Sequence, residues 1–543
     1  MSNSDSIPVY EAIARTLADN GIDTMFGLVG EGNLFIANSF VLDHGGAYIA
    51  AANEAGAVMM ALGYASVSGK IGVATVTHGP GLTNTITCLV EAVRARQPLV
   101  LVCGDTAGVD IENFQKIDQR ELVTATGSGF EQVRSAATAL RDVAHAFRRA
   151  AVERRAIVLN VPVDIQVEKI AYQPTPMRIP QTRGLVPVSD DIDNAVGIIA
   201  ASRAPVVVAG RGAISPESRA SLIRLAERIG APLMTSVRAK DLFAGEAFNL
   251  GICGTLSSPE AVEIVLSADC IIGFGAAMGP FTTSMGSYLK DKRIIYNNID
   301  PSEIGKRFTP DAGLVGDAGL VADAIVELMD MAEIPASGFR DVIAARPPAP
   351  PEPDEDLGTA TTMDIRKLMD WIDRTFPKDR VFVGCGGRYL KFGWKRIAID
   401  GPASLVNPAF GAIGFGMPQS IGAAVAAPDR PILMLAGDGS FMIGGIGEFN
   451  TAVRYGLDIV VIVVNDGAYG AEHKHLRNHN VDPSLTMFNW PEFADVAVAL
   501  GGQGYTVRGA GDLPGAAQAI RDRKGPLLID VKIDPDCVPA GAA

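Results

Sequence analysis

The sequence is poor in several features that define particular classes of protein. Its 543 residues contain no block of lysine and arginine, and 61 acidic residues against 47 basic ones give a net charge of −14. An acidic chain without a basic patch is poorly suited to bind the phosphate backbone of nucleic acids. No apolar run approaches the ~18 residues that a membrane-spanning helix needs. We therefore expect neither nucleic acid nor a membrane as a partner.

Cysteine and histidine are also scarce. The chain has six histidines and six cysteines, and the cysteines form no Cys-x-x-Cys pair: Cys88, Cys103, Cys253, Cys270, Cys385 and Cys537. Scattered cysteines are typical of free thiols in a reducing compartment. The start, MSNSDSIPVYEAIA, has no basic stretch followed by an apolar one, so no secretory signal is expected. Together these absences predict a cytoplasmic protein.

What is present is a repeated strand–helix pattern. Short apolar runs alternate with amphipathic helical windows, as in βα units around parallel sheets. Helices are predicted over 9–20 and 54–66. Strands are predicted over 73–77, 99–103, 156–161, 204–210, 270–276, 293–300, 431–437 and 457–465. The fold class is therefore α/β.

The chain divides into three predicted domains, over residues 1–185, 190–340 and 358–543. The clearest linker is RPPAPPEPDEDL at 346–357, where proline extends the backbone and acidic residues repel one another. The first and third domains could be two copies of one architecture. In the second, the turn Gly210-Arg211-Gly212 follows a strand, but a lone Gly-x-Gly is weak evidence for a nicotinamide site.

The most informative segment, residues 437–470, joins two apolar strands through a glycine-rich turn. The first strand runs into Gly437-Asp438-Gly439-Ser440, and the second ends at Asn465, with 25 residues between Gly439 and Asn465. Parallel strands end at one edge of a sheet, where α/β proteins bind ligands. Asp438 and Asn465 are therefore expected to meet as two oxygen ligands of the kind that Mg²⁺ prefers. The glycines and the helix that follows suit a diphosphate.

This arrangement resembles the fingerprint of thiamine diphosphate-dependent enzymes, in which Gly-Asp-Gly is followed at this distance by Asn. The resemblance implies that Asp438, Asn465 and the Gly467 carbonyl hold Mg²⁺. It also implies that Gly439 and Ser440 hold the diphosphate.

A second segment resembles the N-terminal half-site of the same family. In YIAAANEAGAVMMALGYASVSG, Glu54 stands between a strand and an amphipathic helix. A lone glutamate there would be a helix-start carboxylate favoured by the helix dipole. The resemblance instead implies the cofactor-activating glutamate, which bonds the aminopyrimidine so that its imino tautomer removes the thiazolium C2 proton. The C2 carbanion then attacks a substrate carbonyl and leads to an enamine, with the thiazolium as electron sink.

Two further elements extend the resemblance. In NPAFGAIGFGMPQSIGAA, residues 407–424, the Gly411 carbonyl would accept from the aminopyrimidine and Ile413 would lie between the two rings. Taken alone, Ile413 would be an ordinary core residue. After the strand VFV, the resemblance implies that Cys385 and Gly386 contact the diphosphate.

The resemblance covers nearly the whole chain and is to the acetolactate synthase-like group of decarboxylases, carboligases and lyases. It implies three parallel-sheet α/β domains: pyrimidine-binding, central Rossmann-like and diphosphate-binding. In this group the activating glutamate meets the metal site across a subunit interface. A homodimer is therefore the minimum expected, and a homotetramer is common.

Three departures separate the sequence from acetolactate synthases of this group. Their lysine is missing from the aligned segment 125–133, and GAEHKHLRNHN, with His475, stands where they carry a tryptophan. Their FAD-contacting arginine motif is replaced by GFGAAMGPF at 273–281. These departures disfavour FAD. Authentic acetolactate synthesis, an FAD-linked 2-oxoacid oxidase and a non-catalytic subunit remain as alternatives.

Several residues are candidates for substrate contact. His78, in THGPG, follows a strand and is expected to face the thiazolium, and Gln115 lies by resemblance beside the reacting carbon. His473 and His475 stand two residues apart on a predicted helix, so at most one is expected to reach the pocket. Val29 lies in a loop that no motif defines, and Tyr469 follows the metal loop, with core packing equally open for it.

The sequence as a whole predicts a thiamine diphosphate- and Mg²⁺-dependent lyase or transferase. It would make or break a C–C bond beside the carbonyl of a 2-oxoacid or a 2-hydroxyketone, by decarboxylation or by acyloin formation or cleavage. Glu54 would activate the cofactor, and His78 and Gln115 would handle protons and the substrate carbonyl.

Overall fold

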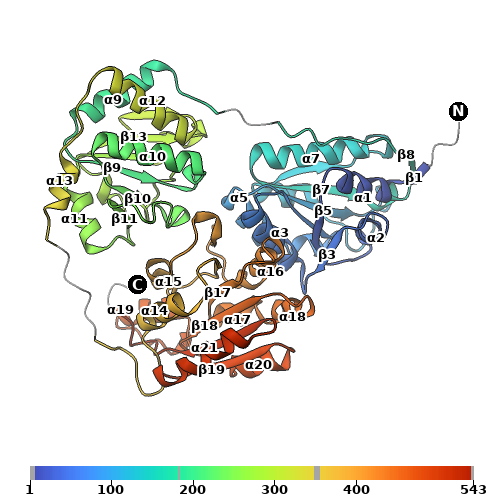
Figure 1. The fold of residues 1–543 in the computed structure, drawn as a ribbon. Helices are drawn as coiled ribbons and strands as arrows, with labels where there is room; N and C mark the ends of the chain where they lie inside the picture. The colour runs from blue at the N-terminus through green and yellow to red at the C-terminus, as the bar shows by residue number, and fades with distance from the viewer. Residues whose placement is uncertain (1–5, 181–183, 348–354, 540–543) are drawn as a thin grey trace. The chain divides into compact units, whose positions relative to one another are not determined.

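Apolar strands pair in parallel to form three six-stranded sheets, each flanked by helices (Figure 1). The computed structural model describes residues 6–180, 184–347 and 355–539. The predicted α/β class is confirmed. The eight predicted strands and two predicted helices are all present, with ends that differ by at most two residues. Each sheet lies inside one predicted domain range. Of the linker predicted at 346–357, residues 348–354 lie outside the described residues.

The N-terminal sheet has the order β3-β2-β4-β5-β7-β6. Its strands are β2 (Thr24–Gly27), β3 (Ala47–Ala50), β4 (Gly72–Val76), β5 (Leu99–Asp105), β6 (Gly129–Gln132) and β7 (Ala156–Pro162). Its helices are α1 (Val9–Asp19), α2 (Leu34–Leu42), α3 (Glu54–Ser68), α4 (Pro80–Thr83), α5 (Ile86–Ala95), α6 (Gln119–Ala125), α7 (Ala139–Glu153) and α8 (Val163–Gln166). A short antiparallel pair, β1 (Ser6–Pro8) with β8 (Lys169–Ala171), joins the ends of this segment.

The C-terminal sheet has the matching order β16-β15-β17-β18-β20-β19, which confirms that the first and third domains share one architecture. Its strands are β15 (Val381–Gly384), β16 (Leu405–Val406), β17 (Ile432–Gly437), β18 (Ile459–Asn465), β19 (Gln503–Val507) and β20 (Leu527–Lys532). Its helices are α14 (Ile365–Thr375), α16 (Gly416–Ala426), α17 (Asp438–Gly444), α18 (Ile446–Arg454), α19 (Gly470–Asn478), α20 (Phe493–Ala499) and α21 (Leu513–Asp522).

The central sheet belongs to a second compact unit. Its order is β11 (Asn249–Ile252), β10 (Leu233–Thr235), β9 (Pro205–Ala209), β12 (Cys270–Phe274), β13 (Arg293–Asn298) and β14 (Ala312–Val315). Helices α9 (Ser189–Ala201), α10 (Pro216–Ile229), α11 (Pro259–Ser267), α12 (Ala318–Met331) and α13 (Phe339–Ala344) complete it. Residues 391–405, which carry most of α15 (Leu390–Arg396), also belong to this unit, although we predicted them within the third domain. One reason is the Ile399 amide, which donates to the Asp241 carboxylate at 2.9 Å.

The N- and C-terminal sheets form one unit because α3 packs closely against α16. A Cβ at Gly63 would lie 2.2 Å from the Gln419 carbonyl oxygen, and one at Gly422 would lie 1.9 Å from that of Met60. Only glycine permits backbones to approach this closely. A single apolar core therefore runs through both sheets and includes Phe26 and Met60 of the first and Met417 and Phe449 of the second. Within the described ranges, no helix has the length and apolar character to cross a membrane.

We expect the Gly422→Ala variant to be less stable than the wild type by about 1–3 kcal/mol, because the added methyl group overpacks the contact between α3 and α16. Gly197→Ala is the matched control. It also lies inside a helix, but a Cβ there meets nothing within 4 Å. Alanine should therefore stabilise that helix by about 0.5–1 kcal/mol. Thermal unfolding of both variants measures the difference, and equal midpoints would contradict the close helix packing.

Candidate functional site

The site begins at the carboxyl edge of the C-terminal sheet, where β17 and β18 end side by side. Gly437 pairs with Val464, so Asp438 and Asn465 follow on neighbouring strands. Asp438 Oδ1 accepts from the Gly439 amide at 2.7 Å, while its other oxygen, Oδ2, is buried without a hydrogen-bond partner. Asn465 Nδ2 donates to the buried Asp530 at 2.9 Å. That bond fixes the amide and leaves Asn465 Oδ1 on the side of the Gly467 turn.

Buried negative charge is concentrated at this edge. Burial, and then the neighbouring Asp466 carboxylate, raise the pKa of Asp438. Burial also raises the pKa of Asp466, opposed by Arg388, whose guanidinium donates to it at 2.7 Å. Arg388 therefore compensates the negative charge of one of these two carboxylates, that of Asp466. A cation bound beside Asp438 would favour its charged form.

These donors fit a magnesium ion. Asp438 Oδ2 is an orphaned carboxylate oxygen, and Asn465 Oδ1, which accepts from the Gly467 amide at 3.2 Å, is a neutral oxygen on the neighbouring strand. The Gly467 carbonyl accepts from the Phe488 amide at 2.7 Å and keeps a second lone pair. Mg²⁺ prefers few protein oxygens and takes its other ligands from water and phosphate. Among the described residues, no group of three or more His, Cys, Asp or Glu side chains forms an alternative metal centre.

Aromatic rings cover the glycines of the Gly437–Ser440 turn. A Cβ at Gly439 would lie 2.5 Å from the Tyr469 ring, and one at Gly437 would lie 3.0 Å from the Tyr389 ring. The Tyr389 hydroxyl donates to the Gly386 carbonyl at 2.7 Å. Tyr469 is therefore part of this site, packed over the glycine turn.

Ser440 and Cys385 link three loops behind the turn. The Ser440 hydroxyl donates to the Cys385 carbonyl at 3.0 Å and accepts from the Gly414 amide at 3.0 Å. The Cys385 thiol is buried, and the Gly416 amide donates to its sulfur at 3.1 Å. Both side chains thus hold the loops together, and burial raises the pKa of the Cys385 thiol.

The loop before α16 presents an apolar side chain to solvent. Ile413 is 38% exposed, although it is aliphatic, and a Cβ at Gly386 would lie 3.1 Å from it. Gly411 adopts a left-handed conformation, with φ of 84°, and a Cβ there would meet nothing within 4 Å. Ile413 therefore packs closely on Gly386 while part of its side chain stays exposed, and the space beside Gly411 is open.

The N-terminal half-site lies where α3 and the 77–81 turn begin. Glu54 is the first residue of α3 and is half-buried, and its Oε2 accepts from Asn84 at 3.0 Å. A Cβ at Gly81 would approach Glu54 Oε1 to 3.8 Å. Glu54 is thus held beside the glycine-rich turn and keeps one face open.

The segments that carry His78 and Gln115 are in contact with each other. His78 is buried, and its Nδ1 has no hydrogen-bond partner. A Cβ at the next residue, Gly79, would lie 2.4 Å from the Gln115 carbonyl oxygen. Gln119, which the sequence interpretation missed, holds this turn by accepting from the Gly79 amide at 2.9 Å.

The other substrate-contact candidates divide into buried and exposed residues. His473 is buried, and its Nε2 lies 2.9 Å from Asp536, which also accepts from Arg477. His475 is exposed and contacts the His479 ring at a tilt, with ring centroids 4.5 Å apart. Val29 is 48% exposed in the loop after β2. The structure thus places His473 inside an ionic contact between α19 and the segment after β20.

Asp466, Arg388 and Asp530 were also missed by the sequence interpretation. Asp466 directly follows Asn465, so its proximity to the metal edge could have been inferred from adjacency alone. Asp530 lies on β20, which pairs with β18, and Arg388 follows β15. Their contacts with Asn465 and Asp466 depend on strand order, which no local pattern gives.

The glycine turn of the central sheet has its amides already engaged. The Gly210 amide donates to Phe274 at 2.8 Å and the Gly212 amide donates to Gly275 at 2.9 Å. These two N–H groups are therefore not free to bind a dinucleotide phosphate, so this turn does not act as a Rossmann phosphate loop.

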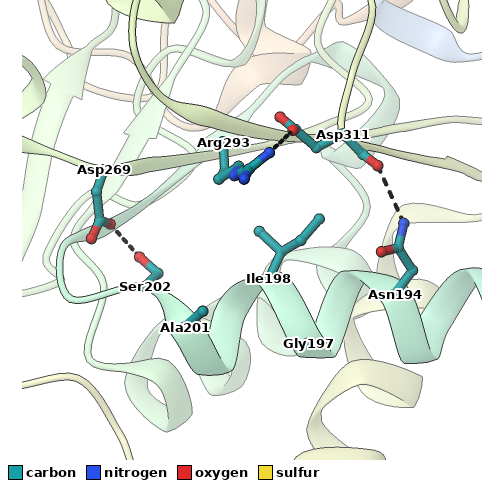
Figure 2. Close-up of a pocket in the computed structure, with 8 residues that line it drawn as sticks. All are labelled: Asn194, Gly197, Ile198, Ala201, Ser202, Asp269, Arg293 and Asp311. Atoms are coloured by element: carbon teal, nitrogen blue, oxygen red, sulfur yellow. Dashed lines mark hydrogen bonds and ion pairs between the residues drawn. The ribbon is translucent and has the colours of Figure 1, made fainter.

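A hollow of about 500 Å³ also lies in the central unit, at the amino ends of β12, β13 and β14 (Figure 2). Asp269 accepts there from Ser202 and from the Arg203 amide, and Asp311 accepts from Arg293. The two carboxylates of this hollow, Asp269 and Asp311, therefore already have hydrogen-bond partners in the protein. Ligands of parallel α/β sheets bind at the opposite, carboxyl edge.

The His473 contact generates a prediction. Hydrogen bonds from Arg477 and His473 lower the pKa of Asp536 to about 2. A carboxyl with a lowered pKa stabilises the fold above its ordinary pKa of about 4 and loses that contribution as the pH falls toward about 2. Asp536→Asn should therefore reduce stability by about 1 kcal/mol at neutral pH, and by progressively less below about pH 4.

Urea unfolding at several pH values measures this difference. The control is Glu472→Gln, because Glu472 is exposed on α19, the helix that carries His473. His473→Asn should behave like Asp536→Asn. If His473→Asn instead raised KM for a substrate without a loss of stability, His473 would belong to the pocket.

Comparison with known proteins agrees with this geometry in all three segments. The chain matches the thiamine pyrophosphate enzyme N-terminal TPP binding domain over residues 7–122, the central domain over 192–325 and the C-terminal TPP binding domain over 386–531.

Full-length relatives are distant. An acetolactate synthase of Mycobacterium bovis is 28% identical, over 97% of this chain and 88% of that protein. A sulfoacetaldehyde acetyltransferase of Alcaligenes xylosoxydans xylosoxydans is 29% identical, over 94% of this chain and 90% of that protein. An acetolactate synthase of Arthrospira platensis is 26% identical, over 97% and 95% respectively. Three consecutive domain matches and an oxygen-lined site at the predicted fingerprint establish the family: the chain belongs to the thiamine pyrophosphate-dependent enzymes of the acetolactate synthase-like group.

Proposed function

We propose that the protein is a thiamine diphosphate- and Mg²⁺-dependent carboligase or lyase. It decarboxylates a 2-oxoacid, or joins or cleaves a 2-hydroxyketone. One observation carries the cofactor assignment. At the predicted fingerprint, Asp438 directly follows the strand next to the one that ends at Asn465, and one of its buried oxygens has no partner. The unpartnered Asp438 oxygen gains a partner when a cation and its diphosphate are bound.

The chain's own residues have distinct roles in this proposal. Bound thiamine diphosphate supplies a nucleophilic carbon and an electron sink. Asp438, Asn465 and the Gly467 carbonyl hold Mg²⁺, and the Gly439 turn receives the diphosphate. Ile413 and the Gly411 carbonyl orient the aminopyrimidine. Glu54 holds a proton at that ring, and its remaining contact is the Asn84 amide, which keeps the carboxyl in place.

His78 and Gln115 are proposed to act on the substrate. His78 Nδ1 is buried without a hydrogen-bond partner and faces Gly32, where an added Cβ would lie 2.6 Å from it. Histidine also exchanges protons near neutral pH. The Gln115 backbone packs on Gly79, which brings this residue beside the same turn.

We propose an acceptor other than pyruvate, and no FAD. The relatives include an acetyltransferase as well as acetolactate synthases at nearly the same identity, so similarity does not favour acetolactate synthesis. The lysine and tryptophan expected of acetolactate synthases are missing. An FAD-linked oxidase is disfavoured because GFGAAMGPF, at 273–281, stands where the FAD-contacting arginine motif is expected.

We also propose that the active form is at least a homodimer. The loop that carries Gln115 exposes three apolar side chains: Val109 is 88% exposed, Ile111 75% and Phe114 93%. Exposed apolar side chains that are clustered in this way favour burial against another protein surface. A second copy would cover this loop and supply its metal edge to Glu54.

The Glu54→Gln variant tests the activation role. Glutamine keeps the shape of the side chain but cannot exchange a proton, so turnover should fall by about 10²–10⁴-fold. Thiamine diphosphate should still bind, because the metal and diphosphate contacts are untouched. Turnover that survives the change would contradict the role of Glu54.

Mixing two inactive variants tests the shared site. Glu54→Gln and Asp438→Ala damage opposite halves, so mixed dimers keep one intact site if the halves come from different subunits. Random mixing should then restore about a quarter of wild-type activity. No recovery after proven subunit exchange would place both halves in one chain.

A substrate panel tests the reaction class. We expect the protein loaded with thiamine diphosphate and Mg²⁺ to release CO₂ from, or to form or cleave, at least one of pyruvate, 2-oxobutyrate, benzoylformate, benzoin, acetoin and a cyclic 1,2-diketone. Turnover of a larger oxoacid or of a hydroxyketone, with little acetolactate from pyruvate, supports the proposal. Efficient acetolactate formation would instead identify an acetolactate synthase.

A further inference from the structure

Two buried glutamates occupy corresponding places in the duplicated architecture. Glu91 lies on α5, between β4 and β5 of the N-terminal sheet, and Glu448 lies on α18, between β17 and β18 of the C-terminal sheet. The two sheets have matching strand orders, so α5 and α18 are equivalent helices. Glu91 is 1% exposed and Glu448 is 0% exposed. Buried carboxylates are costly unless hydrogen bonds compensate them.

Glu91 reaches across to the C-terminal sheet and binds the loop before α16. Its two carboxylate oxygens accept from the amides of Ala409 and Phe410, the latter at 2.7 Å. Arg94, one turn further along α5, lies over the Phe410 ring at 4.8 Å. Gly411 and Ile413 follow directly. The loop that faces the aminopyrimidine in the proposed site is thus held by a carboxylate of the other domain.

Glu448 makes the reciprocal contact with the turn before α3. Its Oε1 accepts from the Ala52 amide at 3.0 Å, two residues before Glu54. A Cβ at Gly56 would lie 2.0 Å from the same oxygen, so the glycine makes room for the carboxylate. The end of α18 continues the contact, because Arg454, its last residue, donates to the Ala50 carbonyl at 2.8 Å.

We infer that Glu91 and Glu448 are paired positioning residues, each of which holds one half of the cofactor site from the opposite domain. This inference rests on the proposed function. Glu448 sets the position of Glu54, and Glu91 sets the positions of Gly411 and Ile413. The buried N–H groups of the two turns have the glutamates as hydrogen-bond acceptors only as long as α3 and α16 hold the two domains together.

Replacement of the two glutamates by glutamine should have different effects. Both oxygens of Glu91 accept from N–H groups, so Glu91→Gln brings an NH₂ group against a donor and breaks one bond. Only Oε1 of Glu448 makes a well-formed hydrogen bond, from the Ala52 amide, with the Thr451 hydroxyl and the Asn53 amide near the carboxyl. Glu448→Gln can therefore retain the oxygen that Ala52 needs. Glu91→Gln should therefore behave like Glu91→Ala, whereas Glu448→Gln should rescue the defect of Glu448→Ala.

Amide hydrogen exchange on the cofactor-free protein tests the contacts directly. Glu91→Ala and Glu91→Gln should raise exchange in residues 407–415 only, and Glu448→Ala should raise it in residues 51–56 only. Val143→Ala is the control, since Val143 is buried in the core on the other face of the N-terminal sheet. It should lower stability without opening either turn. Unchanged exchange in the glutamate variants would overturn the inference.

Cofactor binding and turnover test the positioning. Glu91→Ala and Glu91→Gln should weaken thiamine diphosphate binding at least about tenfold. Glu448→Ala should bind the cofactor normally but lose turnover and the near-ultraviolet circular dichroism of the activated ring. Variants that open their turns yet match Val143→Ala in affinity and turnover would overturn the inference. Failure of the wild type itself to bind thiamine diphosphate would overturn the proposed function first.

Discussion

The structure depends on the close approach of α3 and α16, where glycine lets two helix backbones touch. Gly63 lies against the Gln419 carbonyl and Gly422 lies against that of Met60. Side chains of ordinary size would separate the helices and open the core that both sheets share. The same contact places α5 and α18 beside the loops of the opposite domain. The site at one sheet edge is therefore coupled to the packing of the whole unit.

Several buried carboxylates surround the site, and three of them are compensated by different partners. Asp530 binds the Asn465 amide, Asp466 binds Arg388, and Glu91 accepts from two backbone amides. Asp438 differs because one of its oxygens has no partner. In a chain with net charge −14, a further uncompensated buried carboxylate is costly unless a cation joins it. A bound cation would compensate Asp438, in agreement with the magnesium site that we propose.

Family resemblance and physical geometry contribute different parts of the functional conclusion. The domain matches and the Asp438–Asn465 edge support cofactor use, which the acetolactate synthase-like relatives share by family. Substrate choice depends on side chains that differ within the group. His78 is buried with an unpaired Nδ1, next to the turn on which the Gln115 backbone packs, whereas His473 already contacts Asp536. Two histidines that were equivalent as sequence candidates therefore separate once burial and partners are known.

The sequence by itself determined the three α/β segments and the positions of Glu54, Asp438 and Asn465, because strand periodicity and glycine spacing are local properties of the chain. It could not determine the contacts of Arg388, Asp530, Glu91 or Glu448. Glu91 is more than 300 residues from the loop that it holds, and its two bonds form only after two domains have folded and packed. It likewise could not show that the Gly210–Gly212 turn has its amides bonded to a neighbouring strand end. Long-range hydrogen bonds depend on strand order and helix packing, and only the tertiary structure decides those.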